Sequence, residues 1–175
     1  MTDFTCFGLE PALLRAIKEL GFEKPTPDQS KVLPLLMTGS RDVVALAQTG
    51  TGKTAAYGLP LVQLTDPANP ATQALILCPT RELCLQITQD LRGFAQFIPA
   101  IRILAVYGGA SISEQIRGLR RGAHIIVATP GRMNDLLRRQ SAPLDAVARI
   151  VLDEADEMLN MDDARDRVQR RALAA

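Results

Sequence analysis

The sequence predicts an α/β fold in which an open parallel sheet carries helices on both faces. Five short runs rich in β-branched residues are almost continuously apolar, which is typical of strands buried on both faces of a parallel sheet. Between them lie longer stretches whose apolar residues recur at spacings of three and four, as in helices that pack on one side. Strand and helix alternate without a dividing linker, so we expect one domain over residues 1–175.

The expected elements follow from these two periods. Strands are predicted at residues 43–47, 74–78, 102–106, 125–129 and 149–153. Helices are predicted at residues 11–20, 28–38, 81–96, 111–121 and 130–139. Gly39 ends the second helix, and Pro130 suits the first turn of the last one. Ser111 followed by Glu114 has the spacing of a capping box.

Composition narrows the class of protein. The chain has 20 Lys and Arg against 19 Asp and Glu, so its net charge of +1 excludes a strongly basic nucleic-acid coat and leaves room for a local basic patch. Three cysteines without C-x-x-C spacing indicate neither a disulfide framework nor a zinc site, and they fit a reducing, cytoplasmic location. No apolar run is long enough to span a membrane, and no secretory signal is recognisable.

A glycine-rich segment, AQTGTGKT at residues 47–54, joins the first predicted strand to a helix. Gly50 and Gly52 let backbone N–H groups converge on phosphate oxygens, and the helix N-terminus adds its positive dipole end. Lys53 can reach the β and γ phosphates, and the Thr54 hydroxyl can bind Mg²⁺. The strict phosphate-loop pattern begins with glycine, and this chain has Ala47 at that position. The competing interpretation of residues 47–54 is a glycine-rich turn that binds no ligand.

The last predicted strand ends in Asp-Glu-Ala-Asp at residues 153–156. Ligands of open α/β sheets lie at the carboxyl ends of strands. Asp153 is therefore placed to hold Mg²⁺ directly or through water, and Glu154 to orient and deprotonate an attacking water. Alone, this run would be interpreted as a solvated acidic turn; with the glycine-rich segment it indicates a nucleoside triphosphate site whose catalytic residues are Lys53, Asp153 and Glu154.

Together these segments resemble the first RecA-like domain of DEAD-box ATP-dependent RNA helicases. Further motifs of that family follow in order between residues 4 and 161: the Q motif region (4–29), motif Ia (79–83), the double glycine (108–109) and motif Ib (129–132). Within the family, residues 107–109 and 152–159 are most similar to the bacterial cold-shock and ribosome-assembly branch. The resemblance implies a RecA-like fold with a phosphate-binding loop, and a parent enzyme that remodels RNA duplexes with ATP hydrolysis.

The resemblance implies ATP and Mg²⁺ as cofactors. Gln29 can pair with adenine N6 and N7 at once, which would favour ATP over GTP. Phe22 offers a face for the base or packs in the core, Lys24 lies alongside, and Phe4 is expected to pack against this segment. Asp28 departs from the family, which usually has an apolar residue there. The expected nucleotide-binding residues are Phe22, Lys24, Gln29, Gly50, Thr51, Gly52, Lys53 and Thr54.

The resemblance also implies RNA binding, through residues at the ends of strands and the starts of helices. Backbone N–H groups there can reach phosphates without reading bases, so binding would be independent of sequence. The expected RNA-binding residues are Pro79, Thr80, Arg81, Gly108, Gly109, Thr129, Pro130, Gly131 and Arg132. His124 is expected at the surface or a strand edge, and Cys78 and Cys84 as small core residues.

The family pattern breaks after residue 161. A strand ending in Ser-Ala-Thr is expected there, and in related ATPases it lies between the phosphate-loop strand and the acidic-motif strand. The second RecA-like domain, which supplies the arginine finger and half of the RNA cleft in the family, is also missing. We therefore expect a fragment that binds nucleotide and RNA weakly without unwinding.

Three alternatives stay open at this point. The chain could be an RNA- or partner-binding fragment that never hydrolyses ATP. It could be a different ATPase such as a DNA translocase, against which the Q motif and motif Ib argue. The incomplete sheet could also be filled by a second copy of the chain, or by its own residues 168–175.

Overall fold

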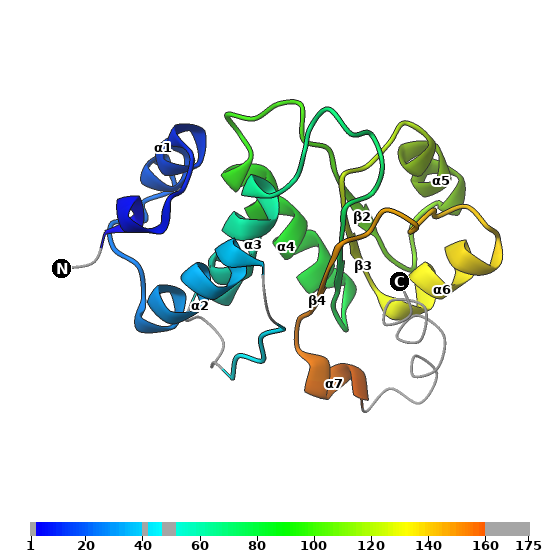
Figure 1. Cartoon of the computed structure of the whole chain (residues 1–175). Helices are drawn as coiled ribbons and strands as arrows, with labels where there is room; N and C mark the ends of the chain where they lie inside the picture. Colours follow the sequence, from blue (N-terminus) through cyan, green and yellow to red (C-terminus); the bar gives the residue numbers. More distant parts are fainter. Residues whose placement is uncertain (1–2, 40–41, 47–51, 160–175) are drawn as a thin grey trace. The chain divides into compact units, whose positions relative to one another are not determined.

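The computed structural model of the chain describes residues 3–39, 42–46 and 52–159 (Figure 1). The chain divides into two compact units. The first, here called the helical unit, comprises Met1–Asp66 and Gln89–Pro99; the second, the sheet unit, comprises Pro67–Thr88 and Ala100–Ala175. Each unit is described by itself, and the single domain expected over residues 1–175 stays a prediction.

The helical unit contains a short 3-10 helix, three α-helices and the last turns of a fourth. They are η1 (Phe4–Phe7), α1 (Pro11–Glu19), α2 (Pro27–Thr38), α3 (Lys53–Gln63) and α4 (Arg81–Phe94). Both helices predicted before the first strand are confirmed to within one residue. Gly39, at φ 62°, ends α2 in the left-handed conformation that glycine adopts without a Cβ penalty. Leu13, Leu33 and Leu59 are fully buried and form the core of this unit.

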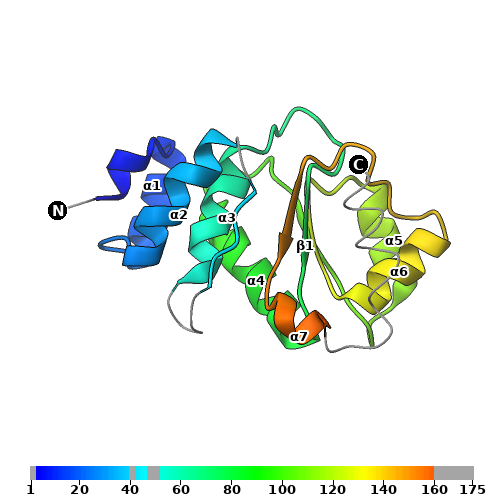
Figure 2. The ribbon, with the colours of Figure 1, turned by 60° about the horizontal axis from the view of Figure 1, so that its bottom comes forward.

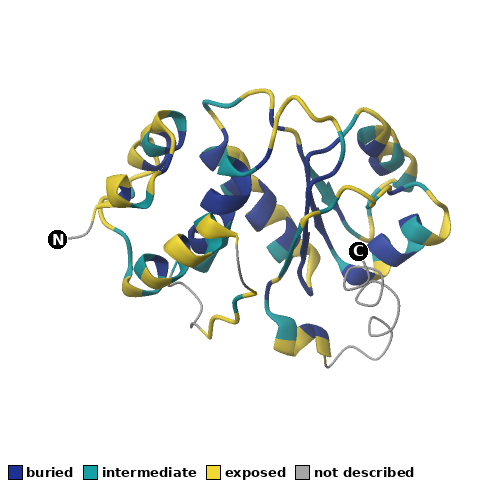
Figure 3. Ribbon diagram, viewed as in Figure 1, coloured by how far each residue is buried: buried dark blue, intermediate teal, exposed yellow. Residues whose placement is uncertain are grey.

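The sheet unit is built on four parallel strands in the order β2-β3-β1-β4 (Figures 1 and 2). They are β1 (Ala74–Leu77), β2 (Ile103–Val106), β3 (Ile125–Ala128) and β4 (Arg149–Leu152), and they confirm four of the five predicted strands. The helices that follow them are α5 (Ile112–Arg120), α6 (Pro130–Arg138) and α7 (Ala155–Leu159). β1 and β3 lie in the middle and are wholly buried, as their continuous apolar character predicts (Figure 3).

Helices cover both faces of this sheet, as expected for the class. On one face lie α5 and α6 (Figure 2). There Leu75 and Ile126 pack with Met133 and Leu136 of α6 and with Leu119 of α5. On the other face lies the first half of α4. Its Cys84 is fully buried, and the thiol donates to the Val127 carbonyl across 3.2 Å.

The strand predicted at residues 43–47 is wrong for the four of its residues that the structure describes. Residues 42–46 pair with no strand among the described ranges, and Val44 and Leu46 are 91% and 95% exposed. The remaining residue, Ala47, lies outside those ranges. Apolar, β-branched sequence favours extended backbone, but a strand also needs a neighbour to complete its hydrogen bonds, and no described segment supplies one here.

His124 was expected at the surface or at a strand edge, and the first of these alternatives is wrong because the side chain is fully buried. It directly precedes β3, and its Nδ1 accepts a hydrogen bond from the Arg102 backbone N–H across 2.9 Å. Its carbonyl accepts from the N–H of Gln73, one residue before β1. His124 therefore joins the amino ends of three neighbouring strands, a role that needs burial and that sequence spacing does not reveal.

No helix in the described ranges is both long and apolar enough to cross a bilayer.

The helical unit generates a prediction about packing. A Cβ on Gly58 of α3 would lie 2.9 Å from Leu91 Cδ2 and 3.1 Å from Phe94 Cε2, both on buried side chains. Alanine gains about 1 kcal/mol of helix propensity over glycine, while overpacking a full core costs about 1–3 kcal/mol. We expect Gly58→Ala to lower the free energy of unfolding by about 1 kcal/mol in urea denaturation.

Gly131→Ala is the matched control, because Gly131 also lies in a helix and a Cβ there meets nothing within 4 Å. This variant should keep or raise the free energy of unfolding. A Gly58→Ala protein as stable as the Gly131→Ala protein would contradict the packing described for α3 and α4.

Candidate functional site

One edge of the sheet gathers four of the motifs found in the sequence. β1 leads into residues 79–83, β2 into 107–109, β3 into 129–132, and β4 into 153–156. All four strands are parallel, so their carboxyl ends lie at the same edge. This is the edge at which open α/β sheets bind ligands.

The acidic motif begins where β4 ends. The backbone N–H of Asp153 donates to the Leu77 carbonyl across 2.9 Å, which extends the ladder by one residue, and Asp153 is buried. Glu154 adopts φ 53°, a left-handed conformation that costs a non-glycine residue on the order of 1 kcal/mol. Its carbonyl accepts from Met158 in the first turn of α7. The strained turn at Glu154 directs the chain from the sheet into α7, and the catalytic roles of both acids stay predictions.

Two buried thiols lie beneath this motif. Hydrogen bonding to Cys84, then burial and the Asp153 and Glu154 carboxylates, raises the pKa of the Cys78 thiol, which is therefore neutral at physiological pH. Cys78 and Cys84 are both fully buried, as predicted for small core residues. Both side chains fill space in the core next to the acidic motif. The neutral Cys78 thiol is not a reactive thiolate.

The phosphate-binding part of the predicted site lies in the helical unit, at the start of α3. Gly52 precedes this helix at φ 80°, and a Cβ there would collide with Nε2 of Gln29. No side chain of the described residues caps α3, so its first N–H groups are available to an anion. Lys53 is half-buried in the first turn. Gly50 and Thr51 lie outside the described residues.

Gln29 links the start of α2 to the start of α3. Its Oε1 accepts from the Thr26 N–H across 2.9 Å, which completes a capping box, and its Nε2 donates to the Gly52 carbonyl across 3.0 Å. The side chain is only 1% exposed. An amide oxygen accepts two hydrogen bonds and an amide nitrogen donates two. One acceptor and one donor position of Gln29 thus remain beyond these two bonds, which is the pair that adenine N6 and N7 would require.

Asp90 of α4 is a polar partner that sequence reasoning missed. The Thr54 hydroxyl is hydrogen-bonded to the Asp90 carboxyl. Burial raises the pKa of Asp90, and the hydrogen bond from Thr54 offsets part of that rise. The sequence does carry a signal for this partner, because Asp90 stands next to Leu91 on the inner side of an amphipathic helix, where a carboxylate needs a polar neighbour. Asp90 orients the hydroxyl that is predicted to bind Mg²⁺.

The oxygen donors predicted for Mg²⁺ are chemically suitable, since this hard cation prefers carboxylate and hydroxyl oxygens together with phosphate and water. No cluster of three metal-binding side chains occurs among the described residues, so phosphate and water would have to complete the shell. Thr54 belongs to the helical unit and Asp153 to the sheet unit. Their joint action on one ion stays a prediction.

The aromatic residues near the Q motif pack on one another. Phe22 meets Phe4 and Phe94 edge-on, with ring centroids 6.2 and 6.0 Å apart. Phe4 is buried, which confirms that it packs against this segment, whereas Phe22 is half-buried and Lys24 is exposed. Asp28 is half-buried in the first turn of α2, where a carboxylate suits the helix dipole. Stacking of a base on Phe22 stays a prediction.

At the sheet edge, Arg81 is held by its neighbours. Its guanidinium lies 5.0 Å from the centroid of the Tyr107 ring, a cation–π contact. Gly109 adopts φ 82°, and a Cβ there would lie 3.3 Å from Arg81 Nη1. The double glycine therefore makes room for the arginine that follows β1. Thr80, also exposed, accepts from the Leu83 N–H through its hydroxyl and caps α4.

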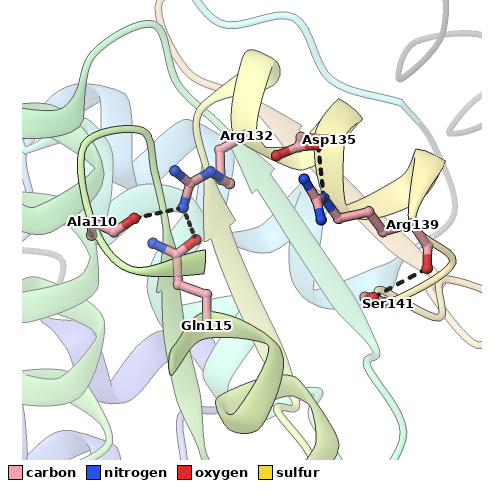
Figure 4. A network of polar contacts seen from close by, with 6 residues as sticks. All are labelled: Ala110, Gln115, Arg132, Asp135, Arg139 and Ser141. Atoms are coloured by element: carbon pink, nitrogen blue, oxygen red, sulfur yellow. Dashed lines mark hydrogen bonds and ion pairs between the residues drawn. The ribbon is translucent and has the colours of Figure 1, made fainter. Parts of the chain in front are cut away.

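Arg132 of α6 is likewise fixed, by two acceptors. Its Nη1 donates to the Ala110 carbonyl and to Gln115 Oε1, each across 3.0 Å (Figure 4). Gln115 Nε2 donates in turn to the Tyr107 carbonyl across 3.0 Å. Gln115 lies on the same buried face of α5 as Leu119, and a polar residue on that face is the signal in the sequence that it has buried partners.

The other predicted RNA-binding residues differ in exposure. Gly108 and Gly131 are exposed, and Thr129 is half-buried. Pro79 and Pro130 are buried and, as prolines, donate no backbone hydrogen bond. Contact of these residues with RNA stays a prediction.

Comparison with known proteins connects these motifs to one family. A family model described as DEAD/DEAH box helicase matches residues 26–174. The chain is 48% identical over 161 residues to ATP-dependent RNA helicase CshA of Listeria monocytogenes, and 48% identical over 163 residues to ATP-dependent RNA helicase DeaD of Mycobacterium tuberculosis. These matches cover 92% and 93% of this chain but only 31% and 29% of the relatives. The chain thus spans about a third of the length of the curated relatives that it matches.

Solved structures show the same fold. A DEAD box protein from Methanococcus jannaschii is 41% identical, with a TM-score of 0.85 over 92% of this chain and 44% of that protein. Dbp5 of S. cerevisiae, solved bound to RNA and ADP BeF3, is 34% identical, with a TM-score of 0.86 over 98% of this chain and 44% of its own. These likenesses confirm the predicted RecA-like α/β fold. The two relatives are bacterial, which confirms the bacterial part of the predicted branch.

The double role of Gln29 generates a prediction. Gln29→Glu keeps an oxygen for the capping box, because glutamate serves that position well, but it removes the donor to the Gly52 carbonyl and sets two oxygens against each other. We expect ATP affinity to fall about tenfold in titration calorimetry. Gln89→Glu, on the exposed side of α4, is the control and should bind ATP like the parent chain.

A parallel titration with GTP separates two mechanisms. If Gln29 acts by fixing the loop, the affinities for ATP and GTP fall together; if it pairs with adenine, the preference for ATP is lost as well. Unchanged ATP affinity would contradict both.

Proposed function

The chain belongs to the DEAD/DEAH box helicase family, and from this premise we propose that it carries the ATP-binding domain of an ATP-dependent RNA helicase. The observation that carries the proposal is the gathering of motifs Ia, Ib, the double glycine and the acidic motif at one edge of a parallel sheet. The names of the two relatives, both ATP-dependent RNA helicases, support it. Free cysteines, of which Cys78 and Cys84 are buried, support a reducing cytoplasm as the site of action.

The chemistry proposed is hydrolysis of the terminal phosphate of ATP. The first N–H groups of α3 and the Lys53 ammonium hold the phosphates, and Gln29 fixes the loop that precedes them. Thr54 and Asp153 would hold Mg²⁺, which would neutralise charge on the phosphates. Glu154 orients the attacking water and takes its proton. The bond between Asp90 and Thr54 keeps the hydroxyl in place before nucleotide binds.

RNA is proposed to bind along the sheet edge through its phosphates. Exposed Gly108, Gly109 and Gly131 offer backbone N–H groups, and Arg81 and Arg132 supply the charge. Such contacts read no bases, so affinity should be independent of sequence. This arrangement explains how a chain with a net charge of +1 can bind a polyanion.

We propose that this stretch alone binds nucleotide and RNA weakly and does not separate strands, because the family's arginine finger and the rest of the RNA cleft belong to a second RecA-like domain. An arginine finger contributes orders of magnitude to hydrolysis in related enzymes. A fragment that binds RNA or a protein partner without hydrolysing ATP is the second candidate, and the exposed motif loops alone would serve it.

The outer edge of β4 supports a further proposal, self-association with a second copy. Among the described residues β4 pairs only with β1, and its Leu152 is 40% exposed. Residues 42–46 pair with no strand among the described ranges and carry two apolar side chains that are almost fully exposed. A strand edge and a β-branched segment that lack a partner among the described residues can pair through their backbone groups and bury their apolar side chains against each other.

The nucleotide site is tested by Lys53→Ala. We expect the substitution to weaken ATP binding about 10- to 100-fold, because it removes a charged partner of the phosphates, and to abolish any turnover of ATP. Lys18→Ala, at an exposed position near the end of α1, should leave both unchanged. Release of inorganic phosphate and calorimetric titration provide the two measurements.

The results separate the candidates. Turnover that Lys53→Ala removes supports the enzyme, binding without turnover supports the non-hydrolysing fragment, and absence of nucleotide binding by the unsubstituted chain contradicts both. Clear separation of an RNA duplex by this chain alone would overturn the proposed inability to unwind.

Self-association is tested by sedimentation velocity over a range of concentrations. The unsubstituted chain should form a dimer or larger species, and Val44→Lys should shift it to monomer, because a charge opposes burial of the paired segment. A monomer at every concentration would contradict the proposal.

A further inference from the structure

Gln115 is a buried polar side chain to which the proposed mechanism so far gives no role. It lies on the inner face of α5 and is 5% exposed. A buried amide is retained where both its donor and its acceptor find partners. Gln115 has both, since Oε1 accepts from Arg132 Nη1 and Nε2 donates to the Tyr107 carbonyl, each across 3.0 Å.

These two partners belong to different motifs of the sheet edge. Tyr107 directly precedes the double glycine after β2, and Arg132 lies in the first turn of α6. Arg132 Nη1 also donates to the Ala110 carbonyl, directly after the double glycine (Figure 4). Gln115 and Arg132 thus hold the backbone on both sides of residues 108–109.

We infer that Gln115 is a positioning residue for RNA: it fixes the Arg132 guanidinium and the double-glycine backbone in the arrangement that receives a phosphate. This inference rests on the proposed RNA binding of the sheet edge. A guanidinium has five N–H donors, and Nη1 contributes two of them. The protein acceptors engage Nη1, so the Nε and Nη2 side is presented as the fork that fits a phosphate.

Glutamine is the side chain that meets both requirements at this position. Glutamate can accept from Arg132 but opposes the Tyr107 carbonyl with a second oxygen. Methionine has nearly the same length and volume and makes neither hydrogen bond. The two substitutions therefore separate the bond to the arginine from the bond to the double-glycine segment.

The experiment measures affinity for RNA by fluorescence anisotropy, with the full chain, labelled oligouridine and saturating ADP–beryllium fluoride. Gln115→Met should weaken RNA binding about tenfold and leave nucleotide affinity unchanged. Gln115→Glu, which keeps the bond to Arg132, should lose less. Gln89→Met, at an exposed position on α4, is the matched control and should bind RNA like the parent chain.

A double-mutant cycle distinguishes positioning from a merely structural role. Arg132→Met alone should weaken RNA binding, and the addition of Gln115→Met should then cost little more, because the glutamine acts largely through the arginine. The guanidinium Nη signals of Arg132 in nitrogen NMR should be sharp in the parent chain and exchange-broadened in Gln115→Met. This signature is also readable without RNA.

Each outcome decides one point. RNA binding that Gln115→Met leaves within twofold, in a protein whose thermal unfolding shows that it is folded, overturns the inference alone. Fully additive losses in the cycle overturn it too. If Gln115→Met fails to fold, the RNA affinities of Gln115→Glu and Arg132→Met are compared with that of the Gln89→Met control instead. The inference is then overturned if Gln115→Glu loses no more RNA affinity than this control does. Absence of RNA binding by the unsubstituted chain overturns the proposed function and this inference with it.

Discussion

The hydrogen-bond ladder of the parallel sheet is the constraint on which the other features of the sheet unit depend. β1 pairs with β3 and β4 in a register that aligns Leu77 with Ala128 and with Leu152, so three strands end at the same level. β2 joins the same register through β3. Because all four strands run in one direction, the loops that leave them must meet at one edge, and helices must return on both faces. A slip of one residue in any pair would move its motif away from this edge and turn its buried side chains to the other face.

A nearly neutral chain that is proposed to bind a polyanion depends on how the arginines at the sheet edge are held. A free arginine loses side-chain entropy on binding, whereas one already fixed in the fold loses little. Arg81 is held over the Tyr107 ring, and Arg132 by the Ala110 carbonyl and Gln115. The double glycine serves both, since it admits Arg81 closely and bears the backbone that Arg132 and Gln115 fix. Affinity can therefore come from geometry where total charge does not supply it.

Local signals in the sequence were sufficient for most elements of the fold. The buried strands β1 and β3, the Ser111 cap of α5 and the glycine that ends α2 each rest on a few neighbouring residues, and each was found. Residues 43–46 were misjudged because a strand exists only with a partner, and partners are a property of the folded chain. His124, Asp90 and Gln115 were missed or misplaced for the same reason: each depends on at least one partner 17 or more positions away. Motif resemblance found the exposed loops of the site and not the side chains that hold them.

Two of the buried glutamines, Gln29 and Gln115, show how such side chains act. Gln29 is 1% exposed and bridges Thr26 and Gly52; Gln115 is 5% exposed and bridges Arg132 and Tyr107. In each case one amide uses its oxygen and its nitrogen on two different segments, so neither segment can shift without loss of a buried hydrogen bond. A carboxylate or a hydrocarbon of similar size satisfies one partner at most. The helical unit and the sheet unit thus use the same device, an amide with both ends engaged, to fix the loop that is proposed to receive a phosphate, that of ATP at Gly52 and that of RNA at the double glycine.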